Sequence, residues 1–336
     1  MNCGYCAISR DYVGTPDFYP TIKELSDKEM TPEEVIEILD RFKKHNRDCF
    51  HIFYGGEPFL FKGLEKVIDH CNKNEIAYTV ITNGSDLAKR RLSDMLMKGE
   101  IDHLEGLTCS IDPPAENKII DVNKKSNSGL KFLIEFKDIA KDLVAEVTLT
   151  TKNMKNTILL LQTLTNHGIY ASLTSIDIKM NECYDFSNIY PDEDYLVLQQ
   201  NKETRNLFNE ILDRKDLLVH MRKVINDFYY ILPRSMCDMH QENIHNVTVD
   251  ADGGLRLCLR IRGKFSPQTH IKDFIDENGN LLLSQPLKDM NTDRSNMCLG
   301  CNWTCRLFSR AIEISPCEVG NLLHSKERGL SLSERG

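Results

Sequence analysis

The sequence predicts an α/β protein: an incomplete parallel barrel, followed by a small cysteine-rich α+β domain. Between Thr31 and Tyr230, helical and strand patterns alternate, as in repeated βα units around a parallel sheet. The strand segments are near-continuous apolar runs, which is typical of parallel sheets that are buried on both faces. After Pro233 the pattern changes to short strands, a turn and cysteines. We therefore predict two domains, residues 1–232 and residues 233–336.

The first helix is marked by local signals. Thr31 can cap it, Pro32 suits its first position, and Glu34 completes a capping box before a one-sided series of apolar residues. The elements that we predict after this helix are strand Cys49–Tyr54, helix Phe61–Asn74, strand Ala77–Thr82, helix Asp86–Lys98, strand Leu104–Ile111, helix Gly129–Lys141, strand Val144–Thr150, helix Met154–His167, strand Tyr170–Ile178, a loop at Asn181–Glu203, helix Asn206–Tyr230, and a hairpin of Val247–Val249 with Leu255–Leu257 around Asp250–Gly254.

Composition excludes several classes of function. The chain has 336 residues, of which 41% are hydrophobic and 27% charged, and these values are ordinary for a globular protein. No apolar run approaches the roughly 18 residues of a membrane span, and the first residues do not resemble a signal peptide. A formal charge of −8 argues against a phosphate-binding surface. We expect a cytoplasmic protein with neither nucleic acid nor membrane as partner.

The twelve cysteines are unevenly distributed. In a chain of this size without an export signal, clustered cysteines bind metal more often than they form disulfides. Cys49, Cys71 and Cys109 lie inside apolar segments, so we interpret them as buried thiols. Most of the others gather at the two ends of the chain.

Polar motifs follow three neighbouring predicted strands, at the edge where parallel barrels gather their functional residues. Gly55-Gly56-Glu57-Pro58 follows the first of these strands, Thr82-Asn83-Gly84 ends the second, and Ser110-Ile111-Asp112 ends the third. Glycines at a strand end let a backbone approach a ligand closely, and a carboxylate beside them can bind an ammonium group. Ordinary turns or a helix cap would explain the same residues without a ligand.

The first six residues, Met1-Asn2-Cys3-Gly4-Tyr5-Cys6, resemble the end of the Cys-x3-Cys-x2-Cys motif of radical S-adenosylmethionine (SAM) enzymes. Cys3 and Cys6 would be the second and third cysteines, and Tyr5 the customary aromatic residue before the last one. The first cysteine would lie upstream of Met1, so we predict that the natural protein extends there with a strand and a cysteine. The resemblance implies a partial TIM-like (βα)6 radical SAM barrel, of which the given sequence is expected to lack the first strand.

The same resemblance implies roles at the strand ends. In this family the segment matching Gly55, Gly56 and Glu57 binds the amino group of SAM, and the segment matching Thr82 and Asn83 lies beside the SAM pocket. Groups at the positions of Ser110 and Asp112 often reach the SAM ribose or carboxylate. The later strand ends, Thr151–Asn153 and Asp177–Lys179, do not match the family's adenine-binding pattern.

A cluster held by three cysteines explains the implied chemistry. Three thiolates on a four-iron four-sulfur cluster leave one iron open for SAM, and electron transfer from the cluster splits SAM to a 5′-deoxyadenosyl radical. Such an enzyme also needs a reducing donor such as flavodoxin or ferredoxin. Cys3 and Cys6 alone would hold the cluster weakly.

The cysteines of the last third resemble the SPASM/twitch domains that carry auxiliary iron–sulfur clusters. Cys237 is followed after fifteen residues by Gly253 and after four more by Cys258, and Cys298-x2-Cys301-x3-Cys305 resembles the second half of that pattern. One ligand is missing for two clusters, so we expect one auxiliary 4Fe–4S cluster. Cys317 is an alternative ligand, and a structural zinc site is the alternative explanation. The candidate ligands are Cys237, Cys258, Cys298, Cys301 and Cys305.

The function implied is a radical SAM enzyme that abstracts hydrogen from a peptide, protein or small-molecule substrate. Leu259 stands where sulfatase-maturing relatives have an acidic residue, which argues against that branch. Cys183 is a candidate hydrogen-atom donor, with an idle thiol as the alternative. The competing hypothesis is a non-catalytic iron–sulfur or zinc-stabilised binding protein that has lost the SAM cluster.

Overall fold

The computed structural model describes residues 29–45, 49–112, 128–149, 153–175, 202–223, 248–249, 251–256 and 270–281. The amino-terminal Cys3–Cys6 motif, Cys183 and every cysteine after it lie outside these residues. The predictions about their ligands therefore stay predictions.

The described part of the barrel contains a six-stranded sheet in the order β1-β2-β3-β4-β5-β6. Every neighbouring pair is parallel. Because sequential strands are spatial neighbours, each crossover helix returns the chain to the next position, as in a barrel. All five predicted strands are present, with boundaries that differ by up to three residues. The strands are β1 (His51–Phe53), β2 (Tyr78–Thr82), β3 (Leu104–Ile111), β4 (Asp142–Leu149), β5 (Tyr170–Ser175) and β6 (Met221–Lys223).

The sixth strand corrects the prediction of one helix over Asn206–Tyr230. Helix α7 (Lys202–Asp213) ends early, and the short α8 (Lys215–Leu218) leads into β6. The apolar spacing continues past Asp213 with no glycine or proline, so local sequence favoured a helix. Pairing with the edge of β5 stabilises a strand here instead of a helix, because the Ala171 N–H donates to the His220 carbonyl at 2.8 Å.

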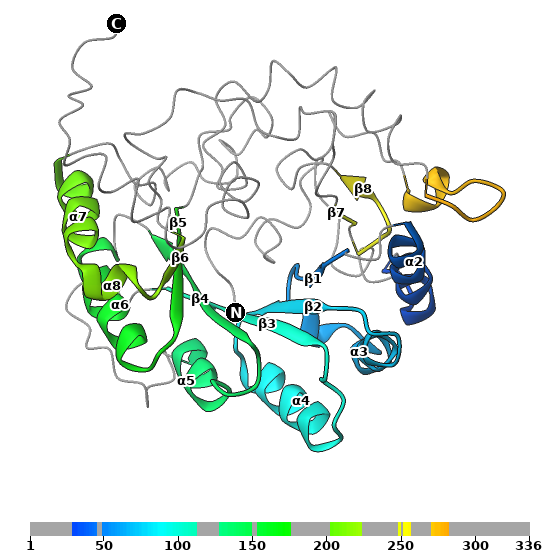
Figure 1. Ribbon diagram of the computed structural model, residues 1–336, viewed down its shortest axis with the longest axis horizontal. Coiled ribbons are helices and arrows are strands. Elements are labelled where there is room, and N and C mark those ends of the chain that lie inside the picture. Colours follow the sequence, from blue (N-terminus) through cyan, green and yellow to red (C-terminus); the bar gives the residue numbers. More distant parts are fainter. Residues whose placement is uncertain are drawn as a thin grey trace, which may run out of the picture.

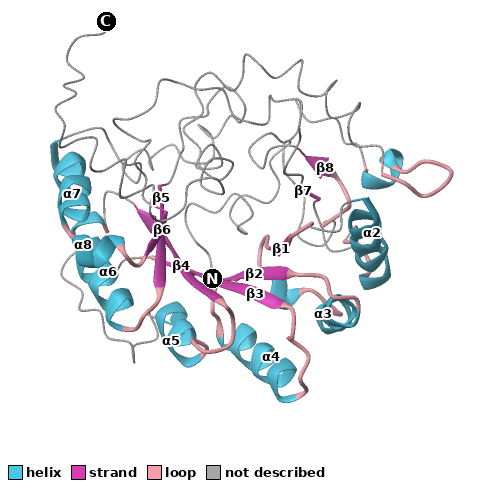
Figure 2. Cartoon of the chain, in the orientation of Figure 1, coloured by secondary structure: helices cyan, strands magenta, loops and turns pink. Residues whose placement is uncertain are grey.

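Figure 1 shows helices α3 to α6 along the outer side of the curved sheet, and Figure 2 shows the same arrangement by element type. Two predicted helices have a short 3₁₀ turn at or before their start, η2 (Pro58–Leu60) and η4 (Met154–Asn156), and the helix predicted over Gly129–Lys141 ends early at Glu135. None of the helices described is long and apolar enough to cross a membrane. The helices before α7 are α2 (Pro32–His45), α3 (Leu64–Lys73), α4 (Asp86–Met97), α5 (Ser128–Glu135) and α6 (Thr157–Asn166).

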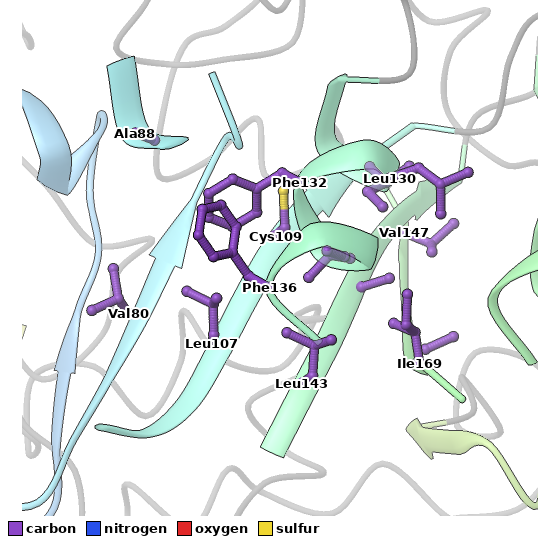
Figure 3. Close-up of a cluster of buried hydrophobic side chains, with 14 of the residues drawn as sticks. Val80, Ala88, Leu107, Cys109, Leu130, Phe132, Phe136, Leu143, Val147 and Ile169 are labelled. Atoms are coloured by element: carbon purple, nitrogen blue, oxygen red, sulfur yellow. The ribbon is translucent and has the colours of Figure 1, made fainter. Parts of the chain in front are cut away.

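The main core lies between the sheet and these outer helices. Figure 3 shows Phe132 of α5 and Phe136, the residue after this helix, beside Cys109 of β3. The two rings lie 4.7 Å apart between centroids, and both Phe132 and Cys109 are buried. Cys71 is also buried, which confirms the interpretation of Cys71 and Cys109 as core thiols. Cys49 is only partly buried, because it packs at the border of a second cluster.

This second core joins helix α2 to the carboxyl-terminal part of the chain. The predicted hairpin forms from β7 (Thr248–Val249) and β8 (Leu255–Arg256), which pair antiparallel, and is followed by the 3₁₀ turn η10 (Ile271–Phe274). Polar contacts reinforce the packing: the Met30 N–H donates to the Ala251 carbonyl at 2.6 Å, and Arg41 donates to the Gly279 carbonyl at 2.8 Å. The buried side chains are Ile38, Phe42, Leu255, Ile271, Phe274 and Leu281.

Glu34 serves this junction in two ways. It forms the predicted capping box with Thr31, whose N–H donates to Glu34 at 2.9 Å, and it pairs with Lys272 of η10. These contacts, the Lys272 hydrogen bond first, lower the pKa of Glu34 from its ordinary value of 4.5 to about 2. The carboxylate therefore links the start of α2 to the carboxyl-terminal segment.

We expect the contribution of Glu34 to stability to be lost in acid. A lowered folded-state pKa means that the contribution is complete above about pH 4.5 and disappears as pH falls toward about 2. Glu34→Gln keeps the shape of the cap but removes the charge. Urea unfolding should show wild type more stable than this variant at pH 6 and equal to it near pH 2, whereas a constant difference would contradict the assignment.

Candidate functional site

The three predicted motifs lie next to one another along one edge of the sheet. Glu57 follows β1, Thr82 ends β2 and Ser110 lies near the end of β3, and these strands are parallel neighbours. The register pairs Thr82 with Cys109, so Ser110 comes one residue beyond that pair. The motifs therefore share the carboxyl edge of the sheet, where α/β barrels place their sites.

Glu57 connects the first two motifs by hydrogen bonds. Its Oε1 accepts from the Thr82 hydroxyl at 2.8 Å and from the Phe59 N–H at 3.2 Å, and its Oε2 accepts from the Asn83 N–H at 2.8 Å. The side chain is half-buried, which makes hydrogen bonds to a charged group worth more than in water. A carboxylate has about four acceptor positions, so these three bonds leave one for a ligand.

The Thr82–Ser85 turn is ordered by its own side chains. The Gly84 N–H donates to the Thr82 hydroxyl at 3.2 Å, and the Ser85 N–H donates to Asn83 Oδ1 at 2.9 Å. Ser85 then caps α4 by accepting from the Ala88 N–H. Gly84 has a φ of +62°, and a Cβ there would lie 2.7 Å from Cys109 Sγ. Only glycine fits this position without displacement.

Gly55 and Gly56 present an open backbone beside Glu57. Both residues are exposed, and a Cβ built on either would meet nothing within 4 Å. Gly55 has a φ of +144°, a conformation that favours glycine. Their peptide groups are thus accessible to a ligand next to an anchored carboxylate. This arrangement fits an ammonium group, which takes carbonyl and carboxylate oxygens as acceptors.

Ser110 and Asp112 are both exposed at the end of β3, while Ile111 between them is buried. The register places Glu146 of β4 beside Ser110 and Ser172 of β5 beside Glu146. These three polar residues form a row on the face of the sheet opposite the outer helices. No sequence motif points to Glu146, although it occupies one of the alternate, less buried positions of β4.

Among the described residues, Cys109 is the cysteine close to these motifs, and it does not have the properties of a metal ligand. Burial raises the pKa of the Cys109 thiol well above its usual range, and the negative charge of Glu57 raises it further. Cys109 therefore stays protonated, whereas a metal ligand must be a thiolate. In the described part of the chain, no group of three or more His, Cys, Asp or Glu side chains is arranged to hold a metal ion.

Of the predicted site residues, the structure brings together Gly55, Gly56, Glu57, Thr82 and Asn83, with Ser110 and Asp112 at the next strand end. Arg91 of α4 also contacts the turn that follows the Gly-Gly-Glu-Pro segment. No sequence motif predicted this contact. The remaining predicted residues lie outside the described residues, namely Cys3, Tyr5, Cys6, Cys183, Cys237, Cys258, Cys298, Cys301, Cys305 and Cys317.

The fold is similar to that of solved structures of SuiB from Streptococcus suis. One crystal structure of SuiB matches with a TM-score of 0.54 and 12% identity, over 87% of this chain and 64% of that chain. SuiB bound to S-adenosylmethionine matches with a TM-score of 0.54 and 12% identity, over 94% of this chain and 72% of that one. SuiB bound to the precursor peptide SuiA matches with a TM-score of 0.55 and 13% identity, over 94% of this chain and 71% of that one.

The family comparison covers the part of the chain that carries the candidate site. Residues 1–129 match the model of the Radical SAM superfamily, a range that includes Glu57, the Thr82–Ser85 turn and the end of β3. Over these residues the chain is similar to the radical SAM superfamily, and its partial-barrel fold is similar to that of SuiB.

Proposed function

We propose that this protein is an enzyme that cleaves SAM reductively and uses the resulting 5′-deoxyadenosyl radical to abstract hydrogen from a substrate. The observation that carries the proposal is the anchored carboxylate of Glu57 beside the open backbone of Gly55 and Gly56. These acceptor groups fit the amino group of SAM. The match of residues 1–129 to the Radical SAM superfamily model supports this reaction class.

Cys3 and Cys6 are proposed as two of the ligands of the SAM-binding 4Fe–4S cluster. When bound, this cluster supplies one electron that breaks a carbon–sulfur bond of SAM, leaving methionine and the radical. The radical takes a hydrogen atom from the substrate and becomes 5′-deoxyadenosine. The electron comes from a reducing partner of the flavodoxin or ferredoxin kind.

In this proposal, the residues of the described site bind and orient SAM. Glu57 and the Gly55 and Gly56 carbonyls accept from the ammonium group, and Thr82 and Asn83 fix the Glu57 carboxylate by donating to it. Ser110 and Asp112 are exposed at the adjacent strand end, on the same edge of the sheet. In this proposal they contact the ribose or the carboxylate of SAM.

The proposed substrate is a peptide or protein. The fold match to SuiB supports this class, because one of the SuiB structures is bound to its precursor peptide SuiA. This chain spans only 64% of the length of one of the SuiB structures. One auxiliary 4Fe–4S cluster, held by the cysteines after Pro233, and a cytoplasmic location complete the proposal.

Anaerobic reconstitution with iron and sulfide tests the function directly. With SAM and dithionite, we expect the brown protein to release 5′-deoxyadenosine in amounts that exceed those from free iron and sulfide. A colourless protein that retains zinc, or an iron protein that yields no 5′-deoxyadenosine, would instead support the non-catalytic binding protein.

A further inference from the structure

The turn that follows the Gly-Gly-Glu-Pro motif is held by a second group besides Glu57. Arg91 of α4 donates through Nη1 to the carbonyls of Phe59 and Phe61, the latter at 3.0 Å. Its Nε donates to Glu65 Oε1 at 2.7 Å, and its Nη2 pairs with Glu65 Oε2. One guanidinium therefore binds both ends of the turn and the first part of α3.

This contact differs from an ordinary surface ion pair. The Arg91 side chain is only 17% exposed, and it combines a two-pronged carboxylate contact with two backbone carbonyls. Exposed pairs contribute little because water and lost side-chain entropy offset them. A planar guanidinium can satisfy all these acceptors at once, whereas a lysine ammonium cannot reproduce the same fork.

Arg91 and Glu57 connect the motif to the same rigid unit. Glu57 accepts from Thr82 and Asn83, at the end of β2 and the start of the turn into α4. Ser85 caps α4, and α4 carries Arg91 in its second turn. The loop is thus fixed to the β2–α4 unit before Pro58 through Glu57 and after it through Arg91.

We propose that Arg91 is a positioning residue for the SAM-binding loop, acting through the Phe59 and Phe61 carbonyls to set where Gly55, Gly56 and Glu57 lie. The inference rests on the proposed function for the identity of the ligand. Arg91 itself touches no reacting group. Its role is to keep the loop in the geometry that accepts the ammonium group.

The chain offers a matched control. Arg214 donates through Nε to Asp216 Oδ1 at 2.8 Å and through Nη2 to Asp216 Oδ2 at 2.6 Å, the same two-pronged contact, but at the start of α8 near β6. Arg91→Lys and Arg214→Lys therefore remove equivalent carboxylate geometry. Only the first of these variants frees the turn beside Glu57.

Three measurements on the reconstituted protein separate positioning from stability. Hydrogen exchange measures the exchange rates of the Phe59 and Leu60 amide protons. Steady-state production of 5′-deoxyadenosine gives KM for SAM and kcat, and urea unfolding gives the midpoint of global unfolding. For Arg91→Lys we expect exchange at both amides and KM for SAM to rise about tenfold, with kcat changed less than about twofold. Arg214→Lys should leave exchange at these amides and KM unchanged.

Two outcomes would overturn the inference: unchanged exchange and KM in Arg91→Lys, or lower kcat and stability with unchanged KM, which would indicate a structural role alone. A wild-type protein that neither binds nor cleaves SAM would refute the proposed function. Exchange at Phe59 and Leu60 would then decide separately whether Arg91 holds the loop.

Discussion

Replacing Glu57 by glutamine is expected to lower the affinity for SAM by about 10- to 100-fold, the loss of one hydrogen bond to a charged group. The variant turns one acceptor oxygen into an NH2 donor. In wild type both oxygens face donors, from Thr82 and Phe59 on one side and from Asn83 on the other. Whichever way the amide turns, a donor meets a donor, and the fourth acceptor position no longer faces the ammonium group with full charge.

Glu105→Gln is the matched control. Glu105 lies near the start of β3, at the end of the strand opposite Ser110, and pairs with Lys141. Equilibrium binding of SAM under anaerobic conditions should be unchanged in this variant. Equal affinity of wild type and Glu57→Gln would show that Glu57 has no part in binding.

Gly84→Ala should destabilise the protein by about 2–5 kcal/mol, the sum of left-handed strain and overpacking. At φ +62° an added Cβ would lie 2.7 Å from Cys109 Sγ and 3.0 Å from Gly129 Cα. Because Gly84 follows Asn83, whose N–H donates to Glu57, relief of this clash should also displace the site and weaken SAM binding. Urea unfolding and SAM titration measure the two effects.

Gly99→Ala separates strain from crowding. Gly99 has a φ of +71°, but a Cβ there would meet nothing within 4 Å, so this variant should cost only about 1–2 kcal/mol. Cys109→Ala should cost less in the Gly84→Ala background than in wild type, because it removes the nearest atom. Equal costs of Gly84→Ala and Gly99→Ala would contradict the packing explanation.

Local sequence signals were sufficient for most of the fold. The capping box at Thr31 and Glu34 forms, and five predicted strands form one parallel sheet. Given parallel strands, the motifs had to lie at one edge, so the neighbourhood of Glu57, Thr82 and Asn83 followed from spacing alone. Strand β6 did not follow, because pairing with β5 decides its conformation, and no local pattern encodes that contact.

The chemistry within the site was less accessible from sequence. The role of Arg91 depends on contacts with residues 26 to 32 positions away, and an arginine in an amphipathic helix carries no mark of them. The packing of α2 against η10 joins segments more than two hundred residues apart, as the contact between Lys272 and Glu34, 238 positions apart, illustrates. Such contacts become visible only in three dimensions.

The central claim, that Gly55–Glu57 accepts the amino group of SAM, is tested most directly by a binding cycle. SAM and an analogue without the amino group are titrated anaerobically into wild type and Glu57→Gln. We predict that loss of the amino group weakens binding to wild type by about 10- to 100-fold and to Glu57→Gln by much less. An equal loss in both proteins would show that the ammonium group is bound elsewhere and would contradict the claim.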